Sequence, residues 1–357
     1  MMAWAKMKVA AGVAILCVFA GLVTLEVRAQ TRPSQEAVAA PAHLAGATKR
    51  TTSGDVETQG LLVSAQAASA WTERATSTVR VTMRGGFSGP PAFTTRLEQT
   101  ARCFRAHDGR SHTKLELLSA ERDGKSVGPA RIEEILADKE HIRYVGSGAS
   151  ALQLDPNVQW DRELGRVEWW RKLNLASVET GGFLDGMVAD VEGGPESVIE
   201  LSRKGTPKLA SGVEVVDGIE CRLVESETPA GLVRIWVAPS RGNNIAKFTV
   251  GRPSVVAKDS ENVEMVFDQA KFAEVGGRTV VAGGHFQEKH GVTQSGHYRP
   301  LWEQETTAVR SEIELNPLFD EPGLFTLSGV PDGTAVTIVG SPDNHGYVWR
   351  GGKPVKK

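Results

Sequence analysis

The sequence is poor in the residues that mark most metal and redox sites. It has three cysteines among 357 residues, and no two of them form a C-x-x-C pair. A zinc ribbon needs four closely spaced ligands and a dithiol redox centre needs that pair, so neither is expected. Cys103 and Cys221 lie in apolar, strand-like runs, which favours buried free thiols, although a disulfide between them also fits.

An excess of charge of one sign is also lacking. The 41 basic and 43 acidic residues give a formal net charge of −2, and no run of lysine and arginine is long enough to form a basic patch. Nucleic acid is therefore not an expected partner. The chain has no G-x-S-x-G nucleophile elbow and no P-loop. We accordingly predict no enzyme, no catalytic residue and no cofactor.

Two short patterns have both a chemical and an ordinary structural interpretation. Gly146, Gly148 and Ala151 are spaced as in a dinucleotide-binding turn, but no long helix begins there, which favours a simple turn. His285 and His297 would be cross-strand neighbours if a hairpin turned near Gly291. With a carboxylate they would form a metal or hydrolytic site. Surface histidines on strands explain them equally, so no metal is predicted.

The N-terminal residues differ from the rest. Two lysines precede an apolar run from Val9 to Leu25, and Val27 and Ala29 occupy the −3 and −1 positions of a small-residue cleavage site. This pattern predicts a signal peptide over residues 1–29, cleaved near Ala29, and a periplasmic or otherwise extracytoplasmic protein. An uncleaved membrane anchor is the alternative, because the run is near the lower length limit for a spanning helix. Residues 30–58, rich in Ala, Thr, Ser and Pro, predict a disordered linker.

Most of the remaining chain alternates between apolar and polar residues, which predicts strands. A helix is expected from about residue 60, followed by a strand that carries Val79, Val81 and Met83. Turn pairs such as Asp217-Gly218 separate the later strands, and short connections join only antiparallel neighbours, so we expect a meander. The further strands predicted are Thr94–Arg105, Thr113–Glu121, Glu133–Val145, Val213–Val216, Ile219–Glu225, Leu232–Ala238, Ile245–Val250, Val263–Phe272, Thr279–Glu288, Val292–Tyr298 and Thr307–Leu315.

Two helical segments are expected to cover this sheet. One begins at Asp155-Pro156, a strong N-terminal signal, and carries Trp170 on its apolar stripe. The other runs from about Gly182 to Val191, and a polar loop, "SRKGTPKLASG", follows it.

The strand Leu232–Ala238 is apolar on both sides, which predicts a central, covered strand. Trp236 lies on the opposite side from Val233, Ile235 and Val237. We predict that Trp236 and Trp170 border one space between helix and sheet. Cys221 and Leu223 are further candidate ligand-binding residues; the alternative for all four is close-packed core.

The hairpin "VVDGIECRLVESETPAGLVRIWVAPSRGNNIAKF", the helix that leads into "TVRVTMRG" and the later "FDQAKFAEVGGRTVVAGG" resemble the periplasmic lipoprotein-carrier (LolA/LolB-like) superfamily. The resemblance implies an incomplete, strongly curved antiparallel barrel with helices in its concave side and an apolar ligand in the barrel. The expected fold class is therefore α+β, mainly β: a curved antiparallel meander with helices covering the concave face. The expected domain spans residues 59–316.

Residues 317–357 predict a C-terminal β extension that packs on the edge of the sheet. The function expected is a non-enzymatic extracytoplasmic binding protein for an acyl chain or lipoprotein, monomeric and at most peripherally associated with the envelope. The alternatives are an envelope scaffold whose barrel is filled by its own helices and, third, a hydrolase.

Overall fold

The computed structural model describes residues 53–87, 93–106, 110–126, 132–137, 142–145, 151–154, 178–188, 196–228, 231–253, 261–294, 297–319, 324–325, 330–339 and 346–357. Its helical elements are α2 (Ser53–Ser69), η2 (Ala70–Arg74), η3 (Val178–Thr180), η4 (Gly182–Asp185), α4 (Val198–Arg203) and η5 (Pro239–Arg241). The N-terminal strands are β1 (Ala75–Phe87), β2 (Phe93–Arg105), β3 (Ser111–Arg122), β4 (Lys125–Ser126), β5 (Ile132–Ala137), β6 (Ile142–Val145), β7 (Ala151–Leu154), β8 (Met187–Val188) and β9 (Glu196–Ser197). The later strands are β10 (Lys208–Leu209), β11 (Glu214–Val216), β12 (Ile219–Thr228), β13 (Gly231–Ala238), β14 (Asn244–Pro253), β15 (Glu261–Val275), β16 (Arg278–Gln294), β17 (His297–Leu315), β18 (Ala335–Val339), β19 (Tyr347–Arg350) and β20 (Lys353–Lys356).

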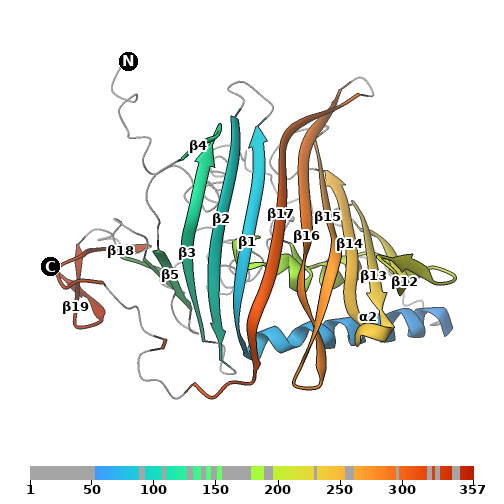
Figure 1. The fold of residues 1–357 in the computed structure, drawn as a ribbon, viewed down its shortest axis with the longest axis horizontal. Coiled ribbons are helices and arrows are strands. Elements are labelled where there is room, and N and C mark those ends of the chain that lie inside the picture. The colour runs from blue at the N-terminus through green and yellow to red at the C-terminus, as the bar shows by residue number, and fades with distance from the viewer. Residues whose placement is uncertain are drawn as a thin grey trace, which may run out of the picture.

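One large sheet forms the body of the molecule (Figure 1). Its neighbours run in the order β12, β13, β14, β15, β16, β17, β1, β2, β3, β5, β6, β7, and every pair in this series is antiparallel. No pairing within the described residues closes the sheet into a barrel. The predicted fold class, a mainly β, open, curved antiparallel meander, is confirmed.

The long strands curve because their ladders are interrupted. Register shifts occur between Asp268 and Lys271 in β15, where Gln269 has a φ of 51°, and again between His290 and Gly291 in β16. A bulge places an extra residue on one strand and bends it, so such shifts allow a sheet to wrap around other segments. The sheet here wraps around residues from α2, η4 and α4, which share one buried cluster with β1–β3 and β12–β16.

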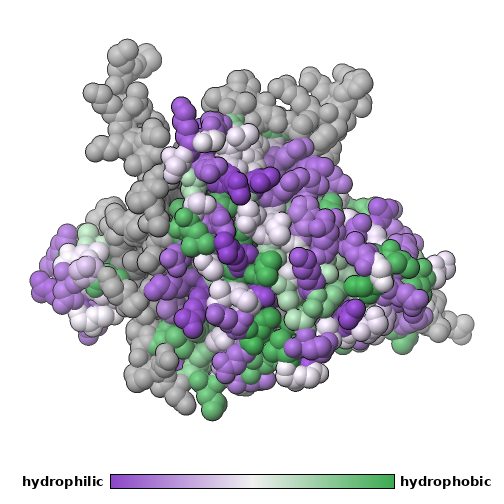
Figure 2. All heavy atoms as spheres, in the orientation of Figure 1, coloured by the Kyte–Doolittle hydropathy of each residue, from purple (hydrophilic) through white to green (hydrophobic). Residues whose placement is uncertain are grey.

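We call the face that contacts these helical elements the inner face and the opposite one the outer face. In Figure 1 the helical segments lie behind the strands, so the outer face is toward the viewer. Apolar side chains of alternate positions point inward, for example Val79 and Val81 in β1 and Val233 and Ile235 in β13. The viewed face mixes hydrophilic and hydrophobic residues (Figure 2). Alternation therefore gives the sheet one dry and one wetter face, as expected for antiparallel sheets.

The hairpins around residues 214–250 were predicted correctly. Strand β12 pairs with β13 through partners such as Leu223 and Trp236, and β13 pairs with β14. The turn residues Asp217 and Gly218 have positive φ values of 49° and 80°, as the Asp-Gly signal requires. β13 is buried on both faces over residues 235–238, as expected for a covered strand, but it lies next to the end of the main strand series and not at its centre.

Several predicted boundaries are wrong. Residues 182–191 do not form one helix: η4 ends at Asp185 and β8 follows. The expected polar loop contains the end of α4 and strand β10. The expected strand over residues 133–145 is two strands, β5 and β6. α2 begins at Ser53, upstream of the expected domain start at residue 59. The predicted helix after Asp155, with Trp170, and the turn over residues 146–150 lie outside the described residues.

The C-terminal residues extend one edge of the sheet. β18 pairs with β7 in parallel, in contrast to the antiparallel series, and β19 and β20 continue beyond it. Val336 and Trp349 form a small separate buried cluster. The position agrees with the predicted edge packing, while the division into a domain over residues 59–316 and an extension over residues 317–357 stays a prediction. Among the described residues, no helix has the length and apolar character needed to cross a membrane.

Candidate functional site

Three phenylalanines form a row on the inner face, one on each of three neighbouring strands. Phe248 of β14 is paired with Phe267 of β15, which is paired with Phe286 of β16. The ring centroids of Phe248 and Phe267 are 5.4 Å apart, and all three side chains are buried. We call these residues the phenylalanine row. It gives the concave side of the sheet a continuous aromatic surface.

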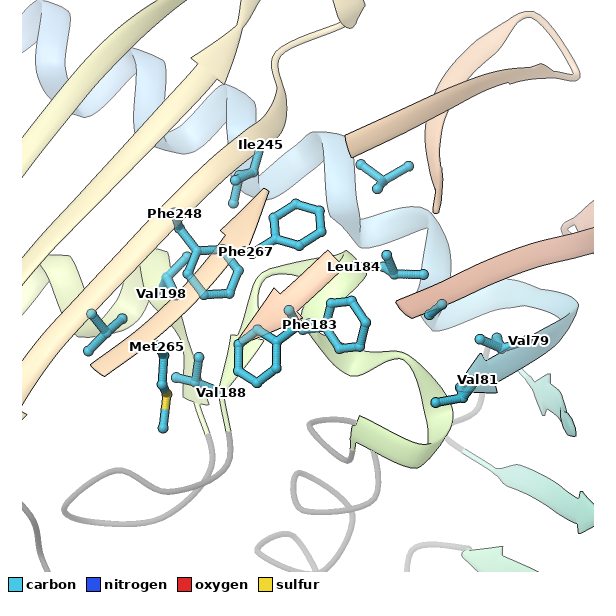
Figure 3. Close-up of a cluster of buried hydrophobic side chains, with 14 of the residues drawn as sticks. Val79, Val81, Phe183, Leu184, Val188, Val198, Ile245, Phe248, Met265 and Phe267 are labelled. Carbon is cyan, nitrogen blue, oxygen red and sulfur yellow. The ribbon is translucent and has the colours of Figure 1, made fainter. Parts of the chain in front are cut away.

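Residues 178–188 lie on this row, and we call them the plug segment. Its Phe183 ring stacks on Phe286, with centroids 5.1 Å apart and planes 17° apart, and lies 5.9 Å from Phe267. Figure 3 shows Phe183 among Phe267, Phe248, Val188 and Met265, with Leu184 on its other side towards β1. The plug segment therefore covers the phenylalanine row with its own apolar side chains.

The plug segment consists of two 3-10 turns and the short strand β8, and glycines flank its second turn. Gly181 and Gly186 flank η4, with φ values of 70° and 73°, a conformation that glycine adopts without strain. A Cβ atom on Gly181 would lie 2.9 Å from Cγ1 of Val79, and one on Gly186 would lie 2.9 Å from Cδ1 of Ile245. Both glycines are thus needed for the turn and for its close approach to the sheet.

A buried ion pair fastens the plug segment to β17. Nη1 and Nη2 of Arg310 each donate to a different carboxylate oxygen of Asp185, both over 2.9 Å. The two side chains are 2% and 7% exposed. Arg310 also donates to the carbonyl oxygen of Val281 and lies 5.1 Å from the ring of Trp71. Breaking such a buried pair leaves a charge uncompensated, so it holds the segment firmly.

The short helix α4 completes the cover of the inner face, beside β12 and β13. Ser197 and Glu200 form a reciprocal capping box: the Glu200 amide donates to Oγ of Ser197, and the Ser197 amide donates to the Glu200 carboxylate. Val198, Ile199 and Leu201 are buried. Sequence reasoning missed this helix, although the S-x-x-E spacing before apolar residues was a signal for it.

The described side chains of the inner face are closely packed. The crevice beside Trp71, Arg105 and Arg310 holds about 10 Å³, roughly the limit for one water molecule. A larger, open hollow of about 480 Å³ lies near the ends of β1, β2 and β17, and its lining includes Arg84, Gly86 and Glu303. Its lining is largely charged, unlike that of an acyl-chain site.

Trp236, Cys221 and Leu223 lie on the outer face, not under the helices. They form a compact cluster with Ala238 and Ala246. The turn between β11 and β12 folds over this cluster: Nε1 of Trp236 donates to Glu214 over 2.7 Å, and the amide of Gln269 donates to Asp217 over 3.1 Å.

The sheet therefore separates Trp236 from α2, η4 and α4, while its expected proximity to Trp170 stays a prediction, because Trp170 lies outside the described residues. Both sides of β13 are apolar, and the alternation alone did not reveal which side the helices cover. Assignment of these residues to ligand binding stays a prediction.

The two cysteines are free and buried. Cys103 of β2 belongs to the inner cluster and Cys221 of β12 to the outer one, so the fold keeps them too far apart to form a disulfide. Burial raises the pKa of the Cys103 thiol above its ordinary value, and burial raises the pKa of Cys221 to about 11. Thiols that are neutral and covered are poor nucleophiles.

The histidines do not converge. β16 continues to Gln294 and β17 begins at His297, so the turn does not lie near Gly291. His285 is opposite Thr307, and His297 is opposite Gln294, about 30 Å along the strand from Thr307. Nδ1 of His285 lies 2.9 Å from an oxygen of Asp268. His285 and His297 are therefore not cross-strand neighbours, and within the described residues no three His, Cys, Asp or Glu side chains could hold a metal ion.

No protein-family model matches the chain, and no curated protein matches it in sequence. Three solved structures are similar to it over most of their length. A DUF1329 family protein from Desulfovibrio piger is 11% identical, with 76% of this chain and 98% of that one covered and a TM-score of 0.38. A LolA superfamily protein from Nitrosomonas europaea is 13% identical, with 76% and 97% covered and a TM-score of 0.33. A domain of an outer membrane lipoprotein-sorting protein from Vibrio parahaemolyticus is 8% identical, with 75% and 96% covered and a TM-score of 0.38.

Proposed function

We propose that this chain is a non-enzymatic extracytoplasmic binding protein for an apolar ligand that contains an acyl chain. The ligand binds the phenylalanine row on the inner face, and the plug segment occupies that site when no ligand is present. The stacking of Phe183 on Phe286 carries this proposal.

In this proposal the plug segment is a cover of the phenylalanine row that a ligand can replace. The row itself belongs to three long strands that are hydrogen-bonded to one another. The cover is short, and the glycines Gly181 and Gly186 flank the turn η4 that carries Phe183. An acyl chain buries the same kind of apolar surface as Phe183 and Leu184, at about 25 cal/mol per Å². The exchange of cover for ligand therefore costs little hydrophobic burial.

We infer the extracytoplasmic location from the sequence of residues 1–29. Their charged start, apolar run and small-residue cleavage site are typical of a secretory signal peptide. We expect a mature N-terminus at Gln30 and a monomer that associates only peripherally with the envelope. N-terminal sequencing of the protein from its native host tests the cleavage, and an intact Met1 would favour the anchored form.

The binding test uses a fluorescent fatty acid and the purified protein. We expect saturable binding by the unmodified chain and tighter binding by Phe183→Ala, because this variant empties part of the site. Leu318→Ala, at a residue 87% exposed, is the control and should bind as the unmodified chain does. Binding by neither the unmodified chain nor Phe183→Ala would contradict the proposal.

A second candidate is an envelope scaffold whose barrel is filled by its own chain. The bidentate pairing of Asp185 with Arg310 favours it, because such a pair holds the plug segment in place. In that case Phe183→Ala lowers the free energy of unfolding by about 3–5 kcal/mol and binds no probe. The same titration thus distinguishes the two functions.

A further inference from the structure

Two arginines share one carboxylate beneath the sheet. Arg310 makes both hydrogen bonds to Asp185, and Nη1 of Arg105 lies 3.9 Å from the same carboxylate. The side chains of Arg105 and Asp185 are 12% and 7% exposed. Among the described residues, the cluster therefore carries one more positive than negative charge, in a place largely withdrawn from water.

The hydrogen bonds in this cluster are also incomplete. Nε of Arg310 is buried and makes no hydrogen bond within the described part of the structure. A buried donor without an acceptor costs about 1–3 kcal/mol, and more when it is charged. Arg105 donates to the carbonyl of Thr72 but approaches Asp185 only loosely. An anion with more oxygen atoms, or with freer placement, would satisfy these donors better than Asp185 does.

The plug segment presents an aromatic ring and a carboxylate two positions apart. Phe183 lies on the phenylalanine row while Asp185 binds the arginines. An amphiphile with an anionic head and an apolar tail offers the same two groups. The two arginines also border a small crevice, together with Trp71 and Ser77.

We propose that the ligand is an anionic amphiphile, whose carboxylate or phosphate head replaces Asp185 at Arg310 and Arg105 while its tail replaces Phe183. This inference rests on the proposed function and adds the chemical class of the head group. Head and tail together replace two contacts of the plug segment, the ring stacking and the ion pair, since Phe183 and Asp185 belong to the same turn. An uncharged lipid would displace only the ring and would leave the ion pair in place.

The test compares a fluorescent fatty acid with its methyl ester and with an alkyl phosphate of the same chain length. We expect the acid and the alkyl phosphate to bind at least about tenfold more tightly than the ester, because charge-assisted hydrogen bonds are about twice as strong as neutral ones. Asp185→Asn removes the competing charge and should tighten binding of both anionic probes. Arg105→Gln should weaken both about tenfold and leave the ester unchanged.

Arg80→Gln is the matched control, because Arg80 is 64% exposed and pairs with Glu98 outside this cluster. Thermal unfolding of each variant checks that it folds. If Asp185→Asn does not fold, the binding measurements on Arg105→Gln still test the inference. Equal binding of acid and ester to the unmodified chain would overturn this inference and leave the proposed function standing. Binding of none of the probes would contradict the proposed function itself. Inorganic phosphate that binds Asp185→Asn as tightly as the fatty acid would also overturn the inference, since the cluster would then be a small-anion site.

Discussion

Gly284 lies directly beneath the ring of Phe267: a Cβ atom built on the glycine would be 2.4 Å from Cε2 and 2.9 Å from Cζ of that ring. The missing side chain in β16 is therefore what allows the phenylalanine of the neighbouring strand to lie flat in the inner cluster. This relationship gives a direct test of the row's packing.

Gly284→Ala should lower the free energy of unfolding by about 1–3 kcal/mol, because the ring and the backbone of Asp268 both have to move. Chemical denaturation measures the change. Gly251→Ala is the matched control, since Gly251 is in strand β14 and has open space where a Cβ would be. Equal stability of the two variants would mean that Phe267 is not held against β16.

Trp236→Ala should lower the free energy of unfolding by about 3–5 kcal/mol, because the ring fills the outer cluster. It should leave the affinity for the fatty-acid probe unchanged, since the ring faces away from the phenylalanine row. Trp236→Phe keeps most of the burial and loses only the hydrogen bond to Glu214, so about 1 kcal/mol is expected. A large drop in probe affinity for both variants would instead assign ligand binding to the outer face.

Thiol labelling should find both cysteines slow to react in the folded protein. With the pKa of Cys221 at about 11, only about one thiol in a thousand is ionised at pH 8. Because the raised pKa favours the neutral form, the rate should rise with pH up to that value. Denaturation without a reducing agent should expose two reactive thiols from Cys103 and Cys221. A count of zero would reveal a disulfide.

Ser197→Ala should lower the free energy of unfolding by about 0.5–2 kcal/mol, because it removes the side-chain acceptor of the capping box of α4. Denaturation of this variant is compared with that of Ser240→Ala, at an exposed position in η5, which should change little. No difference between them would show that α4 does not depend on its cap.

Local patterns were sufficient for the hairpins from β11 to β14, because Asp-Gly and Gly-Asn turns with positive φ lie between short alternating strands. They failed in β16, where Gly291 looks like a turn but lies inside a strand that continues to Gln294. Glycine marks turns and also sites of bending or close approach, and sequence alone does not separate these uses.

The site was harder to predict than the fold. Asp185 and Arg310 are 125 positions apart, and no local sequence pattern around either residue predicts that the two form an ion pair. The plug segment consists of two 3-10 turns and the short strand β8, which have no apolar periodicity long enough to recognise. In the sequence, Phe183 and Leu184 were therefore as compatible with an α-helix as with the observed 3-10 turn.

The pairing of β1 with β17 has a consequence for how the chain acquires its structure. Thr78 and Ser311 are 233 positions apart, yet this pair of strands lies in the middle of the sheet and joins its N-terminal and C-terminal halves. The long loop closure this requires makes folding slow, and β1 keeps a free hydrogen-bonding edge until nearly the whole chain has been synthesised. A chain truncated before β17 would therefore leave its two half-sheets separate, each with an unpaired strand open to aggregation.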